Sequence, residues 1–401
     1  MTTKTPTQGR GRGKILHTAE AARPRLVHAP IRRALLEWFR ANARALPWRG
    51  TADPYAVWVS EIMLQQTQIA TVTPFYQRFL AAFPTVTHLA QAPLERVLEL
   101  WSGLGYYRRA RHLHQAAHTL AKQSRFPEDY AGLRALPGIG DYTAKAILSI
   151  AFNQPYAVLD GNVARVVARL SCLRGNLHQP GFRRAIEAEL LGLLSRREPG
   201  NFNQALMELG QTICPPHGPS CPVCPLAKWC GGYRSGNPEA FPLPRPRRAG
   251  ESPHLAVALL RRGTRVAMAR GLADGLLGDL WNFPSAFGAS PAKAREALRE
   301  KLAGLLRAPA GARHGMPRLR QNGPLFTLGK PVAEFRHAIT FRAIHGQVYA
   351  VETSRPIRPA SLNWFELKRL PQSAISQLAR KIVHEIAPKE IAPPRRRDAE
   401  T

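Results

Sequence analysis

The chain has 401 residues, of which 44% are hydrophobic, so it is not a disordered protein and is longer than one ordinary domain requires. Its 57 Lys and Arg residues against 27 Asp and Glu residues give a formal net charge of +30, which is typical of a protein that binds nucleic acid. An anionic membrane would also attract this charge, but no uninterrupted apolar stretch is long enough to span a bilayer.

The chain begins with a polar, basic segment and continues with a helical pattern. Residues 1–27 show no hydrophobic period and predict a disordered arm, and they lack the apolar core of a secretory signal, which predicts a cytoplasmic protein. Residues 28–232 are expected to form a mainly helical domain. Apolar residues recur there at helical spacing over 31–39, 57–83, 94–101, 109–120, 143–152 and 163–170.

Glu61 lies in the apolar helical segment 53–83, and we expect it in the first turn of one long helix. A carboxyl group beside Trp58 should be desolvated, which would raise its pKa and suit a general acid near neutral pH. A glutamate that only favours a helix N-terminus is an equal alternative from this residue alone. Gln65 and Gln66 follow, and their amides could read base edges or only solvate the helix surface.

Tyr106 and Tyr107 form an aromatic pair that follows two glycines and precedes a basic run at 108–111. An aromatic side chain at a turn beside basic residues can insert into a base stack and help to extrude a nucleotide. Packing in the core is the alternative, and we expect it for one of the two tyrosines.

Gly138 and Gly140 belong to the sequence LPGIGD at 136–141, between two helical segments. Glycines at such a turn allow backbone N–H groups to approach a phosphate, aided by the N-terminus of the next helix. An ordinary helix–helix turn would have the same local sequence. Further along, Asp160 immediately precedes another helical pattern and is expected to cap it.

Four cysteines, Cys214, Cys221, Cys224 and Cys230, are separated by six, two and five residues. Four thiolates so close together can surround one metal centre, and this pattern is unlike a secreted disulfide framework. Zinc is the alternative metal, although structural zinc sites usually pair two close knuckles across a longer insertion.

A second domain is expected after a Pro-, Gly- and Arg-rich linker at 233–252. The pattern predicts strands at 254–260 and 265–269 joined by a turn, a helix at 291–306, a strand pair at 339–344 and 347–352, and a helix at 372–386. This mixture indicates an α+β domain at 253–387, followed by a basic tail at 388–401.

The cysteine spacing, the LPGIGD segment and the run SEIMLQQTQ at 60–68 together resemble the adenine DNA glycosylases of the endonuclease III, or helix-hairpin-helix, superfamily. The resemblance implies an all-helical glycosylase domain with an iron–sulfur loop, followed by a Nudix-like α+β domain. It also implies an enzyme of base excision repair that hydrolyses the N-glycosidic bond of adenine mispaired with 8-oxoguanine or guanine and leaves an abasic site.

The resemblance implies roles for individual residues. Glu61 would protonate adenine, Asp160 would stabilise the sugar cation, and Tyr142 and Asn162 would support them. The four cysteines would hold one [4Fe–4S] cluster. Five residues would contact DNA, namely Gln65, Gln66, Tyr106, Gly138 and Gly140. Strand-cleaving members of the superfamily carry a lysine where this chain has Tyr142, so an essentially monofunctional glycosylase is implied.

For the second domain, the resemblance rests on residues 275–284 and implies recognition of the opposite base. In the family, a Phe-Ser-His element inspects 8-oxoguanine. The nearest match is Ile339-Thr340-Phe341, in which Thr340 keeps the hydroxyl group. The carboxylates of a Nudix metal site are incomplete here, so recognition, and not pyrophosphate hydrolysis, is expected.

Two other interpretations stay open from the sequence. One is a glycosylase for oxidised pyrimidines or thymine mismatches, and the other is a non-catalytic iron–sulfur protein that binds DNA or senses redox state and needs neither Glu61 nor Asp160. The expected partner is double-stranded DNA with an A:8-oxoguanine or A:G mispair, and the expected state is a monomer without membrane association.

Overall fold

The structure, a computed structural model, describes residues 26–123, 125–244, 250–271, 280–306, 325–339, 341–353, 362–372 and 375–386. Its contacts divide the chain into two compact units, each built from two separate segments. Unit 1 comprises Met1–Arg44 and Leu148–Arg245, and unit 2 comprises Ala45–Ile147 and Pro246–Thr401. The domain limits proposed from the sequence stay a prediction.

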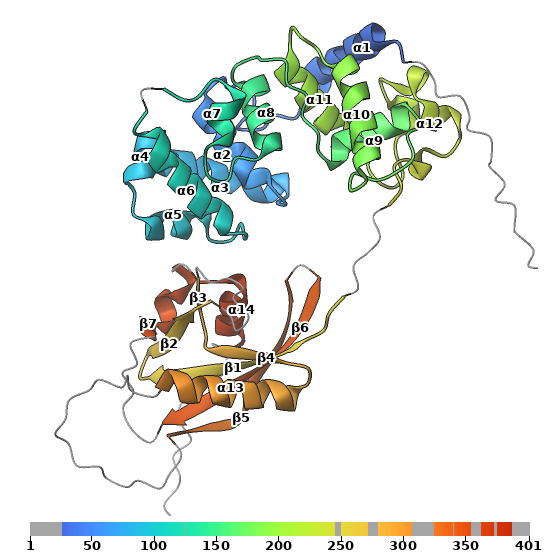
Figure 1. The fold of residues 1–401 in the computed structure, drawn as a ribbon. Helices are drawn as coiled ribbons and strands as arrows, with labels where there is room; N and C mark the ends of the chain where they lie inside the picture. The colour runs from blue at the N-terminus through green and yellow to red at the C-terminus, as the bar shows by residue number, and fades with distance from the viewer. Residues whose placement is uncertain are drawn as a thin grey trace, which may run out of the picture. The chain divides into compact units, whose positions relative to one another are not determined.

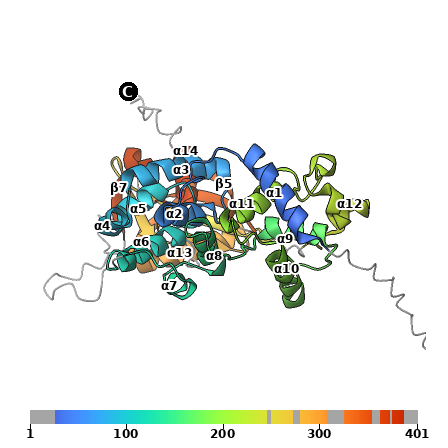
Figure 2. The same cartoon turned by 90° about the horizontal axis from the view of Figure 1, so that it is seen from above.

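Unit 1 is a helical body around one apolar core (Figures 1 and 2). Its helices are α1 (His28–Asn42), α9 (Gly161–Leu170), α10 (Pro180–Leu193), α11 (Pro199–Thr212) and α12 (Gly231–Arg234), with short 3₁₀ turns η1 (Cys221–Val223), η2 (Ala227–Trp229) and η3 (Pro238–Ala240). Helix α1 packs on α10 and α11, and α9 packs on α10, α11 and α12. Proline occupies the first position of α10 and α11, where its missing N–H costs nothing.

The helical part of unit 2 contains α2 (Pro54–Leu64), α3 (Ile69–Ala82), α4 (Val86–Gln91), α5 (Leu94–Trp101), α6 (Arg108–Leu120), α7 (Tyr130–Arg134) and α8 (Asp141–Ile150), whose last residues pass into unit 1. Helix α6 packs on α2, α4 and α5, and α3 packs on α2 and α5. The largest buried side chains there include Trp58, Phe79 and Trp101, and the rings of Phe79 and Trp101 lie edge to face with centroids 5.9 Å apart.

The other part of unit 2 is a mixed seven-stranded sheet between two helices. Its elements are β1 (His254–Arg262), β2 (Arg265–Arg270), β3 (Trp281–Asn282), β4 (Ser285–Gly288), α13 (Pro291–Leu306), β5 (Phe326–Ile339), β6 (Arg342–Thr353), β7 (Asn363–Glu366), η4 (Leu367–Gln372) and α14 (Gln377–Ile386). The strand order is β3-β2-β1-β6-β5, and β4 and β7 pair with β1 and β2. Helices α13 and α14 cover opposite faces (Figure 1).

Alternate residues of β1 enter two different cores. Leu255 and Val257 pack with α14, whereas Ala256 and Ala258 pack with α13. Burial of both faces explains why β1 is a nearly continuous apolar run. The predicted fold class, a helical half followed by an α+β domain, is confirmed.

The predicted strand pair at 339–344 and 347–352 is wrong. Residues 342–353 form one continuous strand, β6, which pairs antiparallel with β5 over the long preceding segment. Gly346 lies inside β6 beneath the ring of Phe335, where a Cβ atom would come within 2.0 Å of that ring. This glycine makes room for a cross-strand aromatic side chain, and it is not a turn residue. Within the described ranges, no helix is both long enough and apolar enough to span a bilayer.

Candidate active site

Glu61 is a buried carboxyl group on α2. Asp53 caps this helix by accepting hydrogen bonds from the N–H groups of Tyr55 and Ala56, and Pro54 is its first residue. Because the helix ends at Leu64, Glu61 lies in its last turn, and the prediction of the first turn is wrong. Its side chain is embedded in the apolar end of α2, so Glu61 is only 7% exposed.

The predicted continuous helix over 57–83 is also wrong, because the chain breaks between α2 and α3. Gln65 is the C-cap of α2, Gln66 has a left-handed backbone with φ 55°, and Gln68 precedes α3. The glutamines therefore do not lie on successive helical turns. The Nε2 atom of Gln65 donates a hydrogen bond to Thr143 Oγ1 on α8, 3.4 Å away.

Tyr106 lies on a tight loop between α5 and α6. Gly103 and Gly105 have φ values of +123° and +72°, and Tyr106 itself has a φ of 49°. The indole N–H of Trp101 donates to the Gly105 carbonyl at 3.1 Å and fixes the loop. Tyr106 is 48% exposed, whereas Tyr107 is buried. The loop thus presents one aromatic ring to solvent and packs the other in the core.

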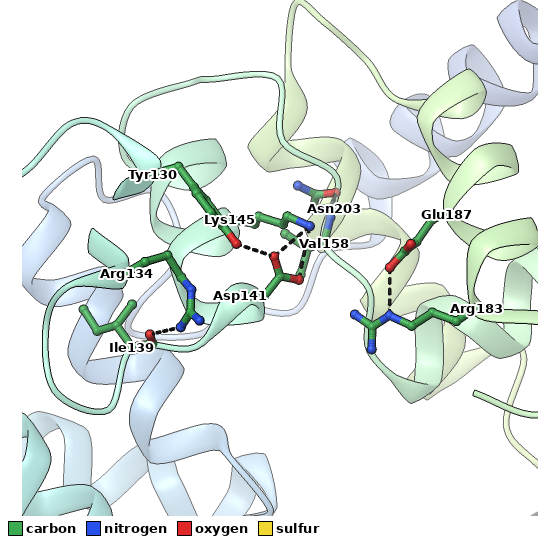
Figure 3. Close-up of polar contacts among 9 residues, drawn as sticks. All are labelled: Tyr130, Arg134, Ile139, Asp141, Lys145, Val158, Arg183, Glu187 and Asn203. Carbon is green, nitrogen blue, oxygen red and sulfur yellow. Dashed lines mark hydrogen bonds and ion pairs between the residues drawn. The ribbon is translucent and has the colours of Figure 1, made fainter. Parts of the chain in front are cut away.

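The hairpin between α7 and α8 contains both predicted glycines. Gly138 has a φ of +79°, and a Cβ atom there would lie 2.6 Å from His112 Cβ. Gly140 has open space around its Cα. The Arg134 guanidinium donates to the Ile139 carbonyl at 2.6 Å, which holds the turn between the two glycines (Figure 3).

The start of α8 contains an ion pair beside Tyr142. Asp141 accepts a hydrogen bond from the Tyr130 hydroxyl at 2.8 Å and pairs with the Lys145 ammonium at 2.9 Å (Figure 3). Lys145 is the lysine nearest to the position at which strand-cleaving relatives have their nucleophile, and it is held by this carboxylate. Tyr142 itself is half-buried in the first turn of α8.

In unit 1, Asp160 caps α9, as predicted. Its Oδ1 atom accepts from the Val163 N–H at 2.7 Å, and its Oδ2 atom accepts from Asn162 Nδ2 at 2.9 Å. Arg165 donates in turn to Asn162 Oδ1 at 2.9 Å and to the Cys214 carbonyl at 2.8 Å. A chain of hydrogen bonds therefore joins Asp160 to the beginning of the cysteine loop.

Asn203 fixes the segment that leads to Asp160. Its Oδ1 atom accepts from the Val158 N–H at 3.2 Å (Figure 3). Its Nδ2 atom donates to the Tyr156 carbonyl at 2.8 Å and to the Ser149 hydroxyl at 2.9 Å. Asn203 is fully buried on α11, and its bonds to Val158 and Ser149 lie in the interior. Also in unit 1, Arg183 and Glu187 form an exposed pair along α10 at 2.8 Å (Figure 3).

Two of the four predicted cysteine ligands, Cys214 and Cys230, contact Arg169 near the end of α9. Arg169, which is buried, donates to Cys214 Sγ at 3.2 Å and to the carbonyls of Pro215 and Pro216 at 2.8 Å each. Cys230 Sγ lies 3.5 Å from the Arg169 carbonyl and donates to it. The buried guanidinium thus supplies positive charge to a site that would carry several thiolates.

The thiols of this loop are free and half-buried. Burial, together with the neighbouring Cys214, Cys230 and Cys221, raises the pKa of Cys224 to about 12. Burial and Cys214 likewise raise the pKa of Cys230. Buried thiol groups whose ionisation is opposed by neighbouring thiols are a donor set that a cationic centre would stabilise. Among the described residues, no three His, Cys, Asp or Glu side chains are spaced to hold a single metal ion.

The predicted site residues fall into the two units. Unit 2 contains Glu61, Gln65, Gln66, Tyr106, Gly138, Gly140 and Tyr142, whereas unit 1 contains Asp160, Asn162 and the four cysteines. Thr340 lies outside the described residues.

Sequence reasoning missed the polar residues that support these groups. Asn203, Arg165 and Arg169 were absent from the prediction, and Arg109 was noted only as part of a basic run. The available signal was the position of Arg165 and Arg169 in a helix that is otherwise almost entirely apolar, since such a charge is buried only with partners. Asn203 gave no comparable signal.

Comparisons with known proteins identify the family. Residues 59–190 match the model of the HhH-GPD superfamily base excision DNA repair proteins. The human protein named adenine DNA glycosylase is 32% identical over 412 residues, which cover 88% of this chain and 73% of the human protein. The chain belongs to the adenine DNA glycosylase family. Because of this family membership, the chain is an enzyme of base excision repair.

Other matches cover smaller parts of this chain. The Arabidopsis thaliana adenine DNA glycosylase is 37% identical over 64% of this chain, which spans 47% of that protein. Among solved structures, a thermostable thymine-DNA glycosylase is 25% identical, covers 51% of this chain and 95% of its own, and has a TM-score of 0.46.

In this adenine DNA glycosylase, the two hairpin glycines should respond differently to alanine. Gly138→Ala should lower the free energy of unfolding by about 2 kcal/mol, because alanine is strained at positive φ and its methyl group meets His112. Gly140→Ala should leave stability nearly unchanged, and on the prediction that a phosphate approaches this glycine it should weaken duplex binding about tenfold. Thermal unfolding and fluorescence anisotropy with a DNA duplex measure the two effects. Equal free energies of unfolding for Gly138→Ala and Gly140→Ala would contradict the strain expected for alanine at position 138.

Proposed function

We propose that this glycosylase removes adenine mispaired with 8-oxoguanine or guanine by hydrolysis of the N-glycosidic bond and leaves an abasic site. The observation that carries the proposal is the burial of the Glu61 carboxyl group in an apolar helix end, next to the break at Gln65 and Gln66. Such a carboxyl group can hold a proton and deliver it in a water-poor pocket. An adenine must leave the base stack to reach it.

In this mechanism, Glu61 donates its proton to a ring nitrogen of the extruded adenine. The protonated base is a better leaving group, so the bond between the sugar C1′ and the base nitrogen breaks and its electron pair goes to the base. Water then adds to C1′ and loses a proton. The products are free adenine and an abasic sugar, with the phosphodiester backbone intact.

Asp160 stabilises the positive charge that develops on the sugar as the base departs. A carboxylate held at a fixed position needs no reorganisation during the reaction, which makes its electrostatic effect large. Its two oxygens already accept bonds from Val163 N–H and Asn162, so the side chain is oriented before DNA binds. Asn162 thus supports the carboxylate, and Tyr142 is proposed as a further supporting residue of the reaction.

Strand cleavage by an amine nucleophile is not expected. Tyr142 occupies the position of the nucleophilic lysine, and Lys145 is paired with Asp141. Gln65, Gln66 and Tyr106 are proposed to occupy or contact the opened duplex, and Gly138 and Gly140 to approach its phosphates. Thr340 is proposed to contact the 8-oxoguanine. The partner is double-stranded DNA, the enzyme acts as a monomer, and a cytoplasmic location is part of the proposal.

The four cysteines are proposed to hold one [4Fe–4S] cluster. Cys214, Cys221, Cys224 and Cys230 supply four sulfur donors, and Arg169 supplies a nearby positive charge. Bound there, the cluster would brace the loop that receives Arg165, and it has no assigned step in hydrolysis. The family, which generally contains such a centre, supports the assignment.

The purified glycosylase should therefore be brown and contain about four irons per chain. Cys224→Ser should lose most of the visible absorbance and the iron, because the change removes one of the four proposed thiolate ligands. Cys172→Ser is the matched control and should keep both. Metal analysis and the absorption spectrum check this, and a colourless protein with one zinc would contradict it.

The substrate proposal is tested with duplexes that differ in one pair. Single-turnover release should be fast for adenine opposite 8-oxoguanine, slower opposite guanine and absent opposite thymine, and the product strand should break only after treatment with alkali. Release of thymine or an oxidised pyrimidine instead of adenine would favour another glycosylase. Binding of DNA without release of any base would favour the non-catalytic alternative.

A further inference from the structure

Arg109 connects the two loops that carry the proposed DNA-inserting side chains. It lies in the first turn of α6, and its two terminal nitrogens are within hydrogen-bond distance of six oxygen atoms. These acceptors come from two places in unit 2, the C-terminal end of α2 and the loop that precedes α6.

On the α2 side, Arg109 Nη1 donates to the carbonyls of Ile62 and Met63 at 2.8 Å each and to that of Gln65 at 2.5 Å. Nη2 donates to Thr67 Oγ1 at 3.1 Å. The last carbonyls of a helix have no partner within the helix and carry its partial negative charge. The guanidinium satisfies them at the end of the helix, just before the cap residue Gln65 and the left-handed residue Gln66.

On the other side, Nη2 donates to the carbonyls of Leu104 and Gly105 at 3.3 and 3.2 Å. The guanidinium carbon lies 5.4 Å from the ring centroids of both Trp101 and Tyr106. The same side chain therefore holds the backbone that precedes Tyr106 and contacts its ring by a cation–π interaction.

Both loops are held in an unfavourable backbone conformation. Four non-glycine residues of the described ranges have positive φ values, and Gln66 and Tyr106 are two of them. Such conformations cost free energy and persist only where surrounding contacts impose them, commonly at functional sites. Arg109 is the side chain that supplies these contacts on both sides.

We propose that Arg109 is a positioning residue that holds Gln66 and Tyr106 at a fixed separation, so that both side chains enter the duplex together when adenine is extruded. This inference rests on the proposed function, because it assigns a role to the geometry of two proposed DNA contacts. Arg109 touches neither the reacting atoms nor, by this assignment, the extruded base.

An arginine is required because one planar group must reach acceptors on both sides at once. Lysine has one nitrogen with three donors and cannot bond to two loops in this fork geometry. Burial lowers the pKa of Arg109 to about 10, which still leaves the guanidinium charged at neutral pH.

The test compares Arg109→Lys with Arg32→Lys. Arg32 also satisfies the carbonyls of a helix end, those of Leu193 and Gly192 at 2.9 and 3.1 Å, but it lies in unit 1 and outside the proposed DNA contacts. Both variants lose a guanidinium that bonds to carbonyls at a helix end, although Arg109 has six acceptors and Arg32 has two. Melting temperature, the single-turnover rate of adenine release from an A:8-oxoguanine duplex, and base extrusion are measured for each.

Extrusion is measured with 2-aminopurine in place of the target adenine, because the fluorescence of 2-aminopurine rises when it unstacks. Each variant carries Glu61→Gln in addition, so that the enzyme binds the duplex without excising the base. Arg109→Lys should slow adenine release about 100-fold, because small misplacements of positioning groups have effects of this size. It should also remove most of the fluorescence rise. Arg32→Lys should keep both the release rate and the fluorescence rise although its melting temperature falls.

If Arg109→Lys does not fold, Thr67→Val serves instead, since it removes one partner of Nη2 and keeps the side-chain volume; it should slow release about threefold and lower the fluorescence rise. The inference is overturned if Arg109→Lys shows the same fluorescence rise and release rate as Arg32→Lys. If Arg109→Lys is unfolded, it is overturned if Thr67→Val shows the release rate and fluorescence rise of the unmodified enzyme. Failure of the unmodified enzyme to release adenine would instead defeat the proposed function.

Discussion

Glu61→Gln should slow single-turnover release of adenine by about 10³-fold or more, while the affinity for an A:8-oxoguanine duplex stays within about twofold. Glutamine has the same shape as glutamate and keeps the packing at the end of α2, but it has no acidic proton to give to adenine. The measurement is release of adenine with enzyme in excess over duplex, together with fluorescence anisotropy for binding. A loss of this size without a change in binding assigns the residue to the chemical step.

Glu208→Gln is the control for burial of a carboxylate. Glu208 is also buried, and its two oxygens accept from Arg44 at 2.5 and 2.9 Å, away from the proposed chemistry. This variant should lower the melting temperature because it weakens a partly buried ion pair, but the rate of adenine release should stay unchanged at a temperature at which it is folded. Equal loss of rate in both variants would indicate destabilisation in place of catalysis.

Asp160→Asn should slow adenine release by about 10³-fold with little change in stability. Asparagine caps helices as well as aspartate does, so α9 should begin at the same residue. What is lost is the negative charge that would face the sugar cation. The rate constant of release and the melting temperature separate these two roles of one side chain.

Asp129→Asn provides the comparison for this variant. Asp129 caps α7 by accepting from the Gly132 N–H at 2.8 Å and has no proposed role in the reaction. Its replacement should change neither stability nor rate appreciably. A rate for Asp160→Asn that is as high as that for Asp129→Asn would mean that Asp160 only caps its helix.

Sequence reasoning succeeded where local rules decide the structure. The cap at Asp160 and the helix at 291–306 follow from residues within one or two turns of each other. The same holds for the turn between β1 and β2, where Gly263 adopts the positive φ that the turn needs.

It failed where residues distant in the chain decide the structure. Helical periodicity continued through 57–83, but a guanidinium from position 109 ends α2 and leaves Glu61 in the last turn. Likewise, the ring of Phe335 requires a glycine at position 346. From the local sequence alone, this glycine predicts a turn between two strands. The supporting residue Asn203 was missed for the same reason, since its partners lie more than 40 positions away.

Asn203 also limits which replacements that position can accept. It offers an acceptor to Val158 and a donor to Tyr156, and so takes the place of a neighbouring strand for a short extended segment. Aspartate would lack the donor, and leucine would lack both the donor and the acceptor that Asn203 offers to the peptide groups of Tyr156 and Val158. The residue at position 203 on α11 is thereby constrained by the need to hold the segment that leads to Asp160, although α11 takes no part in the proposed reaction.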